Sequence, residues 1–225
     1  MISVAMITMN EEGSASTVIE KILKVVPDAE IIIVDSSDDK TPEIAESLGA
    51  KVIRQHPPQG YGKAMDLALR SASGDVIVTL DCDDTYPEES IPEIARYILE
   101  EGYDVVDCSR LMKRPKAMPL SHYIANKFFA WFASILFWRR FTDLHSGMRA
   151  YRKSLVDNME LEASGAALPV ELLLKPIRYG YRVKTVFIDY RERVGQSTVR
   201  GWETSWWTTK RILKVRFGRR PEQSR

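Results

Sequence analysis

Short apolar runs alternate with amphipathic segments along the first half of the chain. The runs are rich in Val and Ile, whereas the segments between them repeat their apolar residues at helical spacing. This alternation predicts an α/β fold with a mostly parallel sheet flanked by helices and joined by right-handed crossovers. Strands are expected at residues 3–8, 30–34, 51–54, 76–80 and 105–109, and helices at residues 14–25, 42–48, 62–72 and 90–101.

The most informative strand is the run that ends at Leu80. It begins after Gly74 and is almost continuously apolar, which is typical of a parallel strand buried on both faces. Three acids follow it, at Asp81, Asp83 and Asp84. Ligands bind at the carboxyl ends of strands in open α/β sheets, and two carboxylates one residue apart can hold Mg²⁺ or Mn²⁺ while leaving positions for phosphate oxygens and water. A solvated acidic turn is the alternative interpretation.

Polar residues also follow the other predicted strands. Because the carboxyl ends of parallel strands meet at one edge of a sheet, these side chains should gather in one crevice. The residues concerned are Thr8, Asn10, Glu11 and Glu12 after the first strand, residues 35–39 after the second, and Ser109 and Arg110 after the fifth. Several strand ends that face one crevice favour a binding site over an isolated acidic turn.

A loop with two glycines precedes the third predicted helix. Gly60 and Gly62 permit a tight turn, and Lys63 in the first helical turn could reach a phosphate near the helix amino terminus. The spacing of a Walker loop is absent. A plain strand-to-helix turn is an equally good interpretation.

The chain has 225 residues, 44% hydrophobic and 28% charged, which suits one compact domain or one domain with an appendage. Its net charge of +1 combines an acidic body, −6 over residues 1–190, with a basic tail, +7 over residues 191–225. Basic tails are typical of contact with phosphates. Cys82 and Cys108 fit neither a disulfide nor a zinc spacing, and the first residues do not form a signal peptide, so a cytoplasmic protein is expected.

The order of the motifs resembles the family 2 glycosyltransferases of the GT-A fold, and within them the dolichyl-phosphate mannose synthase-like group. The resemblance covers about residues 2–200 and implies a GT-A domain over residues 1–200, followed by a basic amphipathic helix or tail over residues 201–225. Each motif is weak alone, and their order is specific. The motifs are Asn10-Glu11-Glu12, Val34-Asp35, Asp39-Lys40-Thr41, Leu80-Asp81-Cys82-Asp83, Ser109-Arg110 and the segments 143–150 and 190–197.

The resemblance implies a role for individual residues. Asp81 and Asp83 would bind Mg²⁺ or Mn²⁺, with Thr85 as a further oxygen ligand, and Arg110 and Arg193 would contact the donor or acceptor phosphates. The expected catalytic residues are Asp83, Arg110, Arg193 and Asp143. The residues expected to contact the nucleotide sugar are Thr8, Asn10, Glu11, Val34, Asp35, Ser36, Lys63, Asp81, Cys82, Ser197 and Arg200.

The chain departs from the family at the nucleoside end. Ile7, Met9 and Ser36 stand where the family usually has Pro, Tyr and often Asp, so GDP-mannose and UDP-glucose are both candidate donors. Thr198 stands where some relatives carry Lys, and Arg200 is the nearest cation that could replace it.

Breaking a sugar–phosphate bond leaves charge on the departing diphosphate, which a divalent cation and fixed Arg and Lys groups can stabilise. A hydroxyl acceptor would also need a general base, for which Asp84, Asp143 and Glu171 are candidates. A lipid phosphate is already anionic and needs no strong base, and the abundance of arginine favours this acceptor. His145 is either a substrate contact or part of the loop structure.

Residues 121–140 form an amphipathic segment with an aromatic-rich run from Phe128 to Trp138. The run is too short to cross a bilayer, which takes about 20 apolar residues, and it suits a helix in the membrane interface. A helix buried against the sheet is the alternative.

The tail is expected to form a second amphipathic helix. Packing in the core or in a homodimer competes with membrane contact as its role, and nucleic-acid binding is not expected because the tail matches no recognised module. The residues on one side of this helix would be Trp202, Trp206, Thr209, Leu213 and Phe217, with positive charge from Lys210, Arg211, Lys214 and Arg216.

The sequence therefore predicts a metal-dependent, inverting glycosyltransferase. It would move a hexose from a nucleoside-diphosphate sugar to a polyprenyl or dolichyl phosphate, bound peripherally at the cytoplasmic face of the membrane. A hydroxyl acceptor, soluble or on a glycolipid, is the main alternative. A nucleotidyltransferase and a non-catalytic membrane scaffold are the others.

Overall fold

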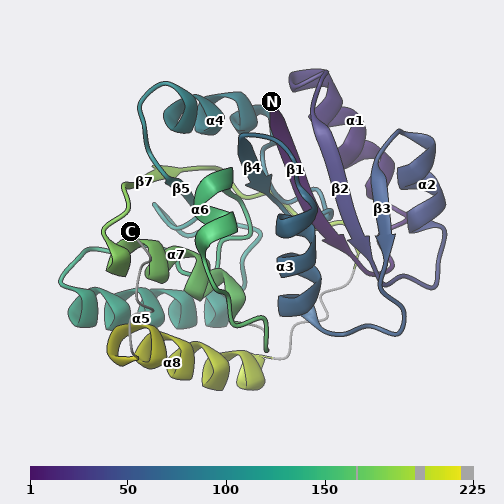
Figure 1. The fold of residues 1–225 in the computed structure, drawn as a ribbon. Helices are drawn as coiled ribbons and strands as arrows, with labels where there is room; N and C mark the ends of the chain where they lie inside the picture. The colour runs from purple at the N-terminus through teal and green to yellow at the C-terminus, as the bar shows by residue number, and fades with distance from the viewer. Residues whose placement is uncertain (166, 196–200, 219–225) are drawn as a thin grey trace.

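A computed structural model describes residues 1–165, 167–195 and 201–218, without the side chains of residues 201–203 (Figure 1). The strands are β1 (Ile2–Thr8), β2 (Glu30–Asp35), β3 (Lys51–Arg54), β4 (Val76–Thr79), β5 (Val105–Ser109), β6 (Arg149–Arg152) and β7 (Val183–Phe187). The helices are α1 (Ala15–Val25), α2 (Thr41–Ser47), α3 (Tyr61–Ser71), α4 (Ile91–Leu99), α5 (Leu120–Phe137), α6 (Lys153–Asn158), α7 (Leu168–Tyr179) and α8 (Gly201–Phe217), with a 3-10 turn η1 at Glu88–Ser90.

The strands form a single sheet in the order β3-β2-β1-β4-β6-β5-β7. Every pairing is parallel except those of β6, which runs antiparallel to both β4 and β5. The mostly parallel sheet predicted from the sequence is confirmed, and β6 and β7 are strands that the sequence analysis missed.

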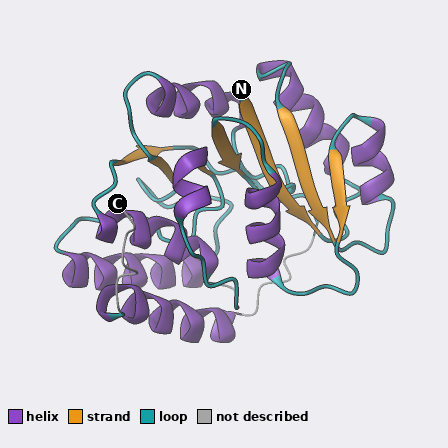
Figure 2. Cartoon of the chain, viewed as in Figure 1, coloured by secondary structure: helices purple, strands orange, loops and turns teal. Residues whose placement is uncertain are grey.

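Alternate residues of the central strands enter two different cores. In β1, Ala5 faces one core and Val4 and Met6 face the other, as the period of two in a strand requires. Helices α1, α2 and α4 cover one face of the sheet, and α3, α5, α6, α7 and α8 cover the other. Figure 2 shows the helices on both sides of the strands. Burial on both faces explains why β4 is apolar throughout.

The reversed direction of β6 decides which loop reaches the ligand edge. Since β6 is antiparallel to its neighbours, its first residue, Arg149, lies at the edge where β4 and β5 end. The segment 143–148, which leads into β6, is therefore placed beside residues 81–85 and Arg110, which leave β4 and β5.

Helices α5 and α8 lie side by side at the bottom of the view in Figure 1. His145 contacts Phe129 of α5 and Thr208 of α8, and further along both helices the Arg216 Nε donates a hydrogen bond to the Leu136 carbonyl at 2.6 Å. These contacts follow the same order along both helices, so α5 and α8 run in the same direction. Ile212 and Val215 of α8 belong to the core under the sheet.

Candidate active site

Two carboxylates share the Arg193 guanidinium near the carboxyl end of β4, and a third carboxylate lies close by. The Arg193 Nη1 lies 2.9 Å from the Asp83 Oδ2, and the Arg193 Nη2 donates to the Glu11 Oε1 at 2.6 Å. Asp81 lies close enough to Asp83, Arg193 and Arg110 for their charges to shift its pKa. The structure therefore brings together Glu11, Asp81, Asp83 and Arg193, which come from segments far apart in the sequence.

The charges of this carboxylate cluster are not balanced. Burial and the neighbouring Asp83 raise the pKa of Asp81 to about 6, against the lowering effect of Arg110 and Arg193. Burial also raises the pKa of Glu11 to about 7, with Arg193 opposing the shift and Asp83 and Asp81 adding to it. A site that disfavours its own ionised carboxylates attracts additional positive charge.

The loop that carries Asp83 is held by short contacts. The Thr85 hydroxyl donates to the Asp83 Oδ1 at 2.6 Å, and the Thr85 N–H donates to the same oxygen at 3.2 Å. Asp84 adopts a φ of 61° and is paired with Lys21 of α1. The Thr85 hydroxyl thus orients Asp83, the residue that it was expected to assist as a metal ligand.

Backbone hydrogen bonds join this loop to two other segments. Ser14 donates from its hydroxyl to the Cys82 carbonyl at 2.7 Å, while the Cys82 side chain packs in the core beside α1 and α4. On the other side, the N–H groups of Arg191 and Val194 donate to the carbonyls of Thr85 and Asp83 at 2.9 and 3.0 Å. A nucleotide contact by Cys82 would have to use its backbone.

Gly147 lies against the Asp81 carboxylate. A Cβ at position 147 would lie 2.8 Å from the Asp81 Oδ2 and 3.0 Å from the Oδ1, closer than real Cβ atoms approach such an oxygen. The Gly147 N–H donates to the Tyr86 hydroxyl and the Gly147 carbonyl accepts from the Thr79 hydroxyl, each at 2.7 Å. The position needs glycine because of space beside Asp81. Tyr86 and Thr79 are contributors that the sequence analysis missed, since their role depends on this tertiary contact.

Arg110 and Asp143 form a second, closed contact in the same crevice. The Arg110 Nε and Nη2 donate to the two Asp143 oxygens at 2.7 and 3.1 Å, and the Asp143 side chain is fully buried. Burial alone would raise the pKa of Asp143, but Arg110 together with the His145 N–H lowers it to about 2. The Arg110 guanidinium also lies over the Tyr190 ring, 5.2 Å from its centroid.

The nucleoside end is built around Asp35, which is fully buried. Its carboxylate accepts from the Thr8 hydroxyl at 2.6 Å, from the Ser37 hydroxyl at 2.6 Å and N–H at 3.0 Å, and from Arg54. These donors bind the carboxylate, so Asp35 ties together the ends of β1, β2 and β3, and its contact with a nucleoside stays a prediction.

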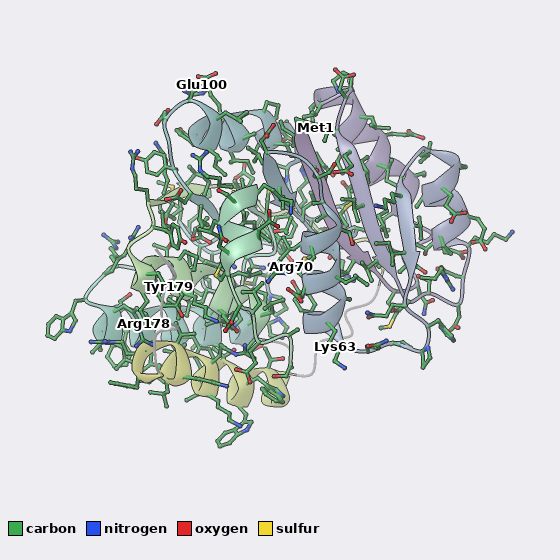
Figure 3. All side chains as sticks on the ribbon, viewed as in Figure 1. Met1, Lys63, Arg70, Glu100, Arg178 and Tyr179 are labelled. Atoms are coloured by element: carbon green, nitrogen blue, oxygen red, sulfur yellow. The ribbon has the colours of Figure 1, made fainter. Side chains whose placement is uncertain are left out.

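The other residues expected near the nucleoside lie around Asp35. The Val34 side chain is in the core, Ser36 donates to the Gln55 carbonyl at 2.9 Å, and the Asn10 side chain accepts from the Asp38 N–H at 2.9 Å. Lys63 is exposed in the first turn of α3, and Figure 3 shows it at the lower end of that helix, opposite the end that carries Arg70. Ser197 and Arg200 lie outside the described residues.

The third candidate base, Glu171, is also paired. It is buried on α7, where Lys175 lies 2.8 Å from its Oε1 and Arg211 contacts its Oε2. These residues line a cavity of about 550 Å³ between α7, α8 and residues 160–162. Figure 3 shows Arg178 and Tyr179 of the same cavity well away from Lys63. Arg211 was predicted to supply positive charge beside the apolar residues of the tail helix; its side chain is instead buried and its charge is paired with Glu171.

A continuous apolar stripe is exposed along α5, and α8 exposes apolar residues beside it. The stripe of α5 follows helical spacing and ends at Trp138, which is 90% exposed and adopts a φ of 54°. The exposed apolar residues are Leu120, Ile124, Phe128, Trp131, Ile135 and Trp138 of the α5 stripe, and Trp206, Leu213 and Phe217 of α8. We call these nine residues the apolar face.

The described residues lack both a membrane-spanning helix and a larger cluster of metal-ligating side chains. Among them, no helix combines the length and apolar character needed to span a bilayer. The same residues contain no group of three or more His, Cys, Asp or Glu side chains arranged to hold a metal ion. Asp81 and Asp83 are therefore a two-carboxylate set, which suits a hard cation that takes its remaining ligands from phosphate and water.

Comparison with known proteins gave related sequences and structures. The family model described as Glycosyl transferase family 2 matches residues 3–159. The chain is 40% identical over 215 residues to a dolichyl-phosphate hexose transferase of Haloferax volcanii, covering 95% of this chain and 93% of that protein. It is 30% identical over 211 residues to a dolichol-phosphate mannosyltransferase of Pyrococcus furiosus, covering 89% of this chain and 59% of that protein.

A solved structure shares the fold. Glucosyl-3-phosphoglycerate synthase from Mycobacterium tuberculosis, crystallised with Mn²⁺, uridine diphosphate and glucosyl-3-phosphoglycerate, superposes with a TM-score of 0.78. The match covers 96% of this chain and 80% of that protein at 22% sequence identity. The predicted GT-A architecture is confirmed by this neighbour.

Proposed function

The chain belongs to the family 2 glycosyltransferases, and we propose that it transfers a hexose from a nucleoside-diphosphate sugar to a polyprenyl phosphate, with inversion, at the cytoplasmic face of a membrane. The family and the transferase activity follow from the family model and from the relatives in Haloferax and Pyrococcus. The names of those two relatives, a dolichyl-phosphate hexose transferase and a dolichol-phosphate mannosyltransferase, support the lipid phosphate as acceptor.

The observation that carries the choice of acceptor is the state of the three bases expected from the sequence, because Asp81 and Glu11, whose pKa values are raised, belong to the cluster that would hold the cation. Asp84, Asp143 and Glu171 are each paired with a cationic side chain. A carboxylate in an ion pair is a poor proton acceptor because its ionised form is stabilised. An acceptor that arrives as an anion, such as a lipid phosphate, needs no base.

The carboxylate cluster fits a divalent cation. Asp81 and Asp83 offer hard oxygen ligands. The Arg193 guanidinium contacts Asp83, which shows that the cluster accepts positive charge, and Gly147 leaves room beside the Asp81 carboxylate. Mg²⁺ or Mn²⁺ bound there would supply positive charge that stabilises the leaving diphosphate. The Arg193 fork can contact two phosphate oxygens at once, and Lys63 at the amino terminus of α3 can add a point charge.

An acceptor assay tests the proposal directly. The purified protein is incubated with GDP-mannose or UDP-glucose, Mg²⁺ or Mn²⁺, and either a polyprenyl phosphate or the matching polyprenol. Hexose should be transferred to the phosphate and not to the alcohol, and NMR of the product should give the inverted anomer. Equal transfer to polyprenol would overturn the lipid-phosphate acceptor in favour of a hydroxyl acceptor.

The apolar face supports contact with an anionic membrane. Large apolar residues are exposed in a row, and the exposed cations Lys113, Lys116, Arg140 and Lys210 stand next to them in the sequence. Apolar insertion and charge attraction add, with about 1 kcal/mol for each cation near an anionic surface. This arrangement would hold the active site at the depth of lipid phosphates.

Flotation with anionic vesicles separates the two contributions. Trp131→Glu with Trp138→Glu should weaken binding at every ionic strength, because apolar insertion is not screened. Arg140→Ala with Lys210→Ala should weaken it mainly at low salt, because charge attraction is screened. Leu99→Glu is the matched control, since Leu99 is 52% exposed on α4, which covers the other face of the sheet. If the intact chain does not float, the apolar face is a protein contact, as in a homodimer.

A further inference from the structure

We propose that His145 is a positioning residue that couples the docking of α8 on a lipid surface to the placement of Arg110 in the active site. The proposal rests on the function given above and adds the means by which contact with the membrane changes the site. It is carried by a continuous series of contacts from α8 to Arg110 and Asp81.

The first contact joins α8 to the segment before β6. The His145 Nε2 lies 2.8 Å from the Thr208 Oγ1, and Thr208 is fully buried. Phe129 of α5 packs against the same imidazole. The two ring centroids lie 5.8 Å apart and the ring planes meet at 68°. His145 is thus held between the two helices that bear the apolar face.

The second contact joins the same residue to the active site. The backbone N–H of His145 donates to the Asp143 Oδ1 at 3.0 Å, and the Asp143 carboxylate holds the Arg110 guanidinium through two hydrogen bonds. Two residues after His145, Gly147 lies against the Asp81 carboxylate. A shift of the His145 backbone would therefore reach Arg110 through the Asp143 carboxylate, and Asp81 through Gly147.

The two sides of α8 face different surroundings. Thr208, Ile212 and Val215 face inward, whereas Trp206 and Phe217 are exposed on the apolar face. Insertion of the exposed residues into lipid fixes the position of α8. Because the Thr208 hydroxyl contacts the His145 Nε2, the position of α8 then determines the position of the imidazole ring. The His145 Nδ1 is buried without a hydrogen-bond partner among the described residues, so the Thr208 hydroxyl is the polar contact that orients the ring.

The test compares two neighbouring threonines of α8. Thr208→Val removes the hydroxyl at His145 and keeps the shape of the side chain. Thr209→Val is the matched control, because the Thr209 hydroxyl donates to the Ser205 carbonyl within α8. Turnover is measured with a short, water-soluble prenyl phosphate, with and without vesicles of equal parts phosphatidylcholine and phosphatidylglycerol, so that acceptor delivery does not depend on the membrane.

Vesicles should raise kcat of the wild type and of Thr209→Val by about fivefold or more, the lower range of allosteric coupling. The rise should be absent in Thr208→Val and in His145→Leu, and partly restored in His145→Gln, whose amide can reach the Thr208 hydroxyl. If Thr208→Val responds to vesicles as the wild type does, or if the wild type floats without any response, the coupling is refuted.

Hydrogen exchange provides a readout without any substrate. Vesicles should slow amide exchange of residues 143–148 in the wild type and in Thr209→Val, and leave it unchanged in Thr208→Val. A chain that shows this pattern but transfers no hexose would refute the proposed function and keep the coupling. A chain that transfers hexose without the pattern would do the reverse.

Discussion

Two arginine–carboxylate contacts lie in the same crevice and differ in how their charges are balanced. Arg110 meets one acid, Asp143, and both side chains are almost completely buried. Arg193 meets two acids, Asp83 and Glu11, and its side chain is 31% exposed. The first contact lowers the pKa of its carboxyl to about 2, whereas the second leaves Glu11 with a pKa of about 7.

The difference separates a structural contact from one that can exchange partners. A buried one-to-one pair is complete, and its loss leaves a buried charge without compensation. A cluster with more acids than bases is incomplete and gains from a further cation. Mutations at the two contacts should therefore fail in different ways: the first should cost stability together with the placement of Arg110, and the second should cost activity with little loss of stability.

The largest effect is expected at the closed contact. Asp143→Asn removes the charge that compensates Arg110 and should lower the free energy of unfolding by about 3–5 kcal/mol. Urea unfolding measures this loss. Asp84→Asn is the control, since its partner Lys21 is 38% exposed, and it should cost less than about 1 kcal/mol. Similar costs for the two variants would show that the closed contact is not structural.

The open cluster should lose activity rather than stability. Asp83→Asn should lower kcat/KM by about 10²–10³-fold, because charge on the leaving diphosphate is no longer stabilised. We expect Mn²⁺ with GDP or UDP to raise the Tm of the wild type, and Asp83→Asn should abolish this rise. Asp84→Asn, one residue away, should keep both properties. Near-normal turnover of Asp83→Asn at limiting metal would remove Asp83 from the metal site.

The space beside Asp81 can be tested with one methyl group. Gly147→Ala places a Cβ 2.8 Å from the Asp81 Oδ2, so the carboxylate must move. Overpacking of this kind costs about 1–3 kcal/mol, and we expect it mainly as weaker metal–nucleotide binding. Gly13→Ala is the control, because its Cβ would meet only the Val194 Cγ1 at 3.8 Å. Equal affinities for the two variants, measured by calorimetry, would contradict this role of Gly147.

A smaller loss is expected when the fork of the open contact becomes a point charge. Arg193→Lys cannot reach Asp83 and Glu11 together, and kcat/KM should fall about tenfold. Arg191→Lys is the comparison, since Arg191 contacts Glu88 and Glu89 instead. Unchanged kinetics in Arg193→Lys for both donor and acceptor would exclude a bidentate phosphate contact.

The smallest effect concerns the pH dependence of stability. It involves His145, which neighbours the closed contact between Arg110 and Asp143. Burial lowers the pKa of His145 from 6.5 to about 4, with Arg110 and Arg149 adding to the shift and Asp143 opposing it. The unfolded chain therefore binds this proton first, and stability should fall as the pH drops from 6.5 towards 4. Between pH 6.5 and 5.5 the loss should be about 1 kcal/mol greater in the wild type than in His145→Gln. If the same drop in pH lowers the free energy of unfolding equally in the wild type and in His145→Gln, His145 is not a buried neutral imidazole.

The sequence predicts the first half of the fold because its signals are local. Apolar runs and helical spacing locate β1 to β5 and the helices between them, and acids after β4 locate Asp81 and Asp83. The strand β6 was missed because it reads Arg-Ala-Tyr-Arg, and its Arg149 can be buried because Asp107 of β5 and the carbonyls of Leu144 and Pro169 accept its hydrogen bonds. No local sequence pattern indicates that Arg149 pairs with Asp107, which lies 42 residues earlier in the chain.

The same limit applies to the roles of the site residues. The sequence identified Arg110 and Asp35 as polar groups at the ligand edge and Asp143 as a candidate base. It does not show which of these charged side chains already form ion pairs with each other or with other residues. Asp35 was expected to hold the nucleoside and is occupied by Thr8, Ser37 and Arg54. Pairing between loops depends on the order of the strands, which sequence spacing does not contain.

The place of β6 in the sheet has a consequence for biosynthesis. β4 and β5 are joined through β6, which follows β5 by about 40 residues in the chain. While the chain grows on the ribosome, β4 and β5 leave the exit tunnel before the strand that pairs with both. Until residues 149–152 emerge, each presents an unpaired edge, which is a hazard for aggregation. We therefore expect nascent chains that end before residue 149 to recruit chaperones more strongly than chains that include β6.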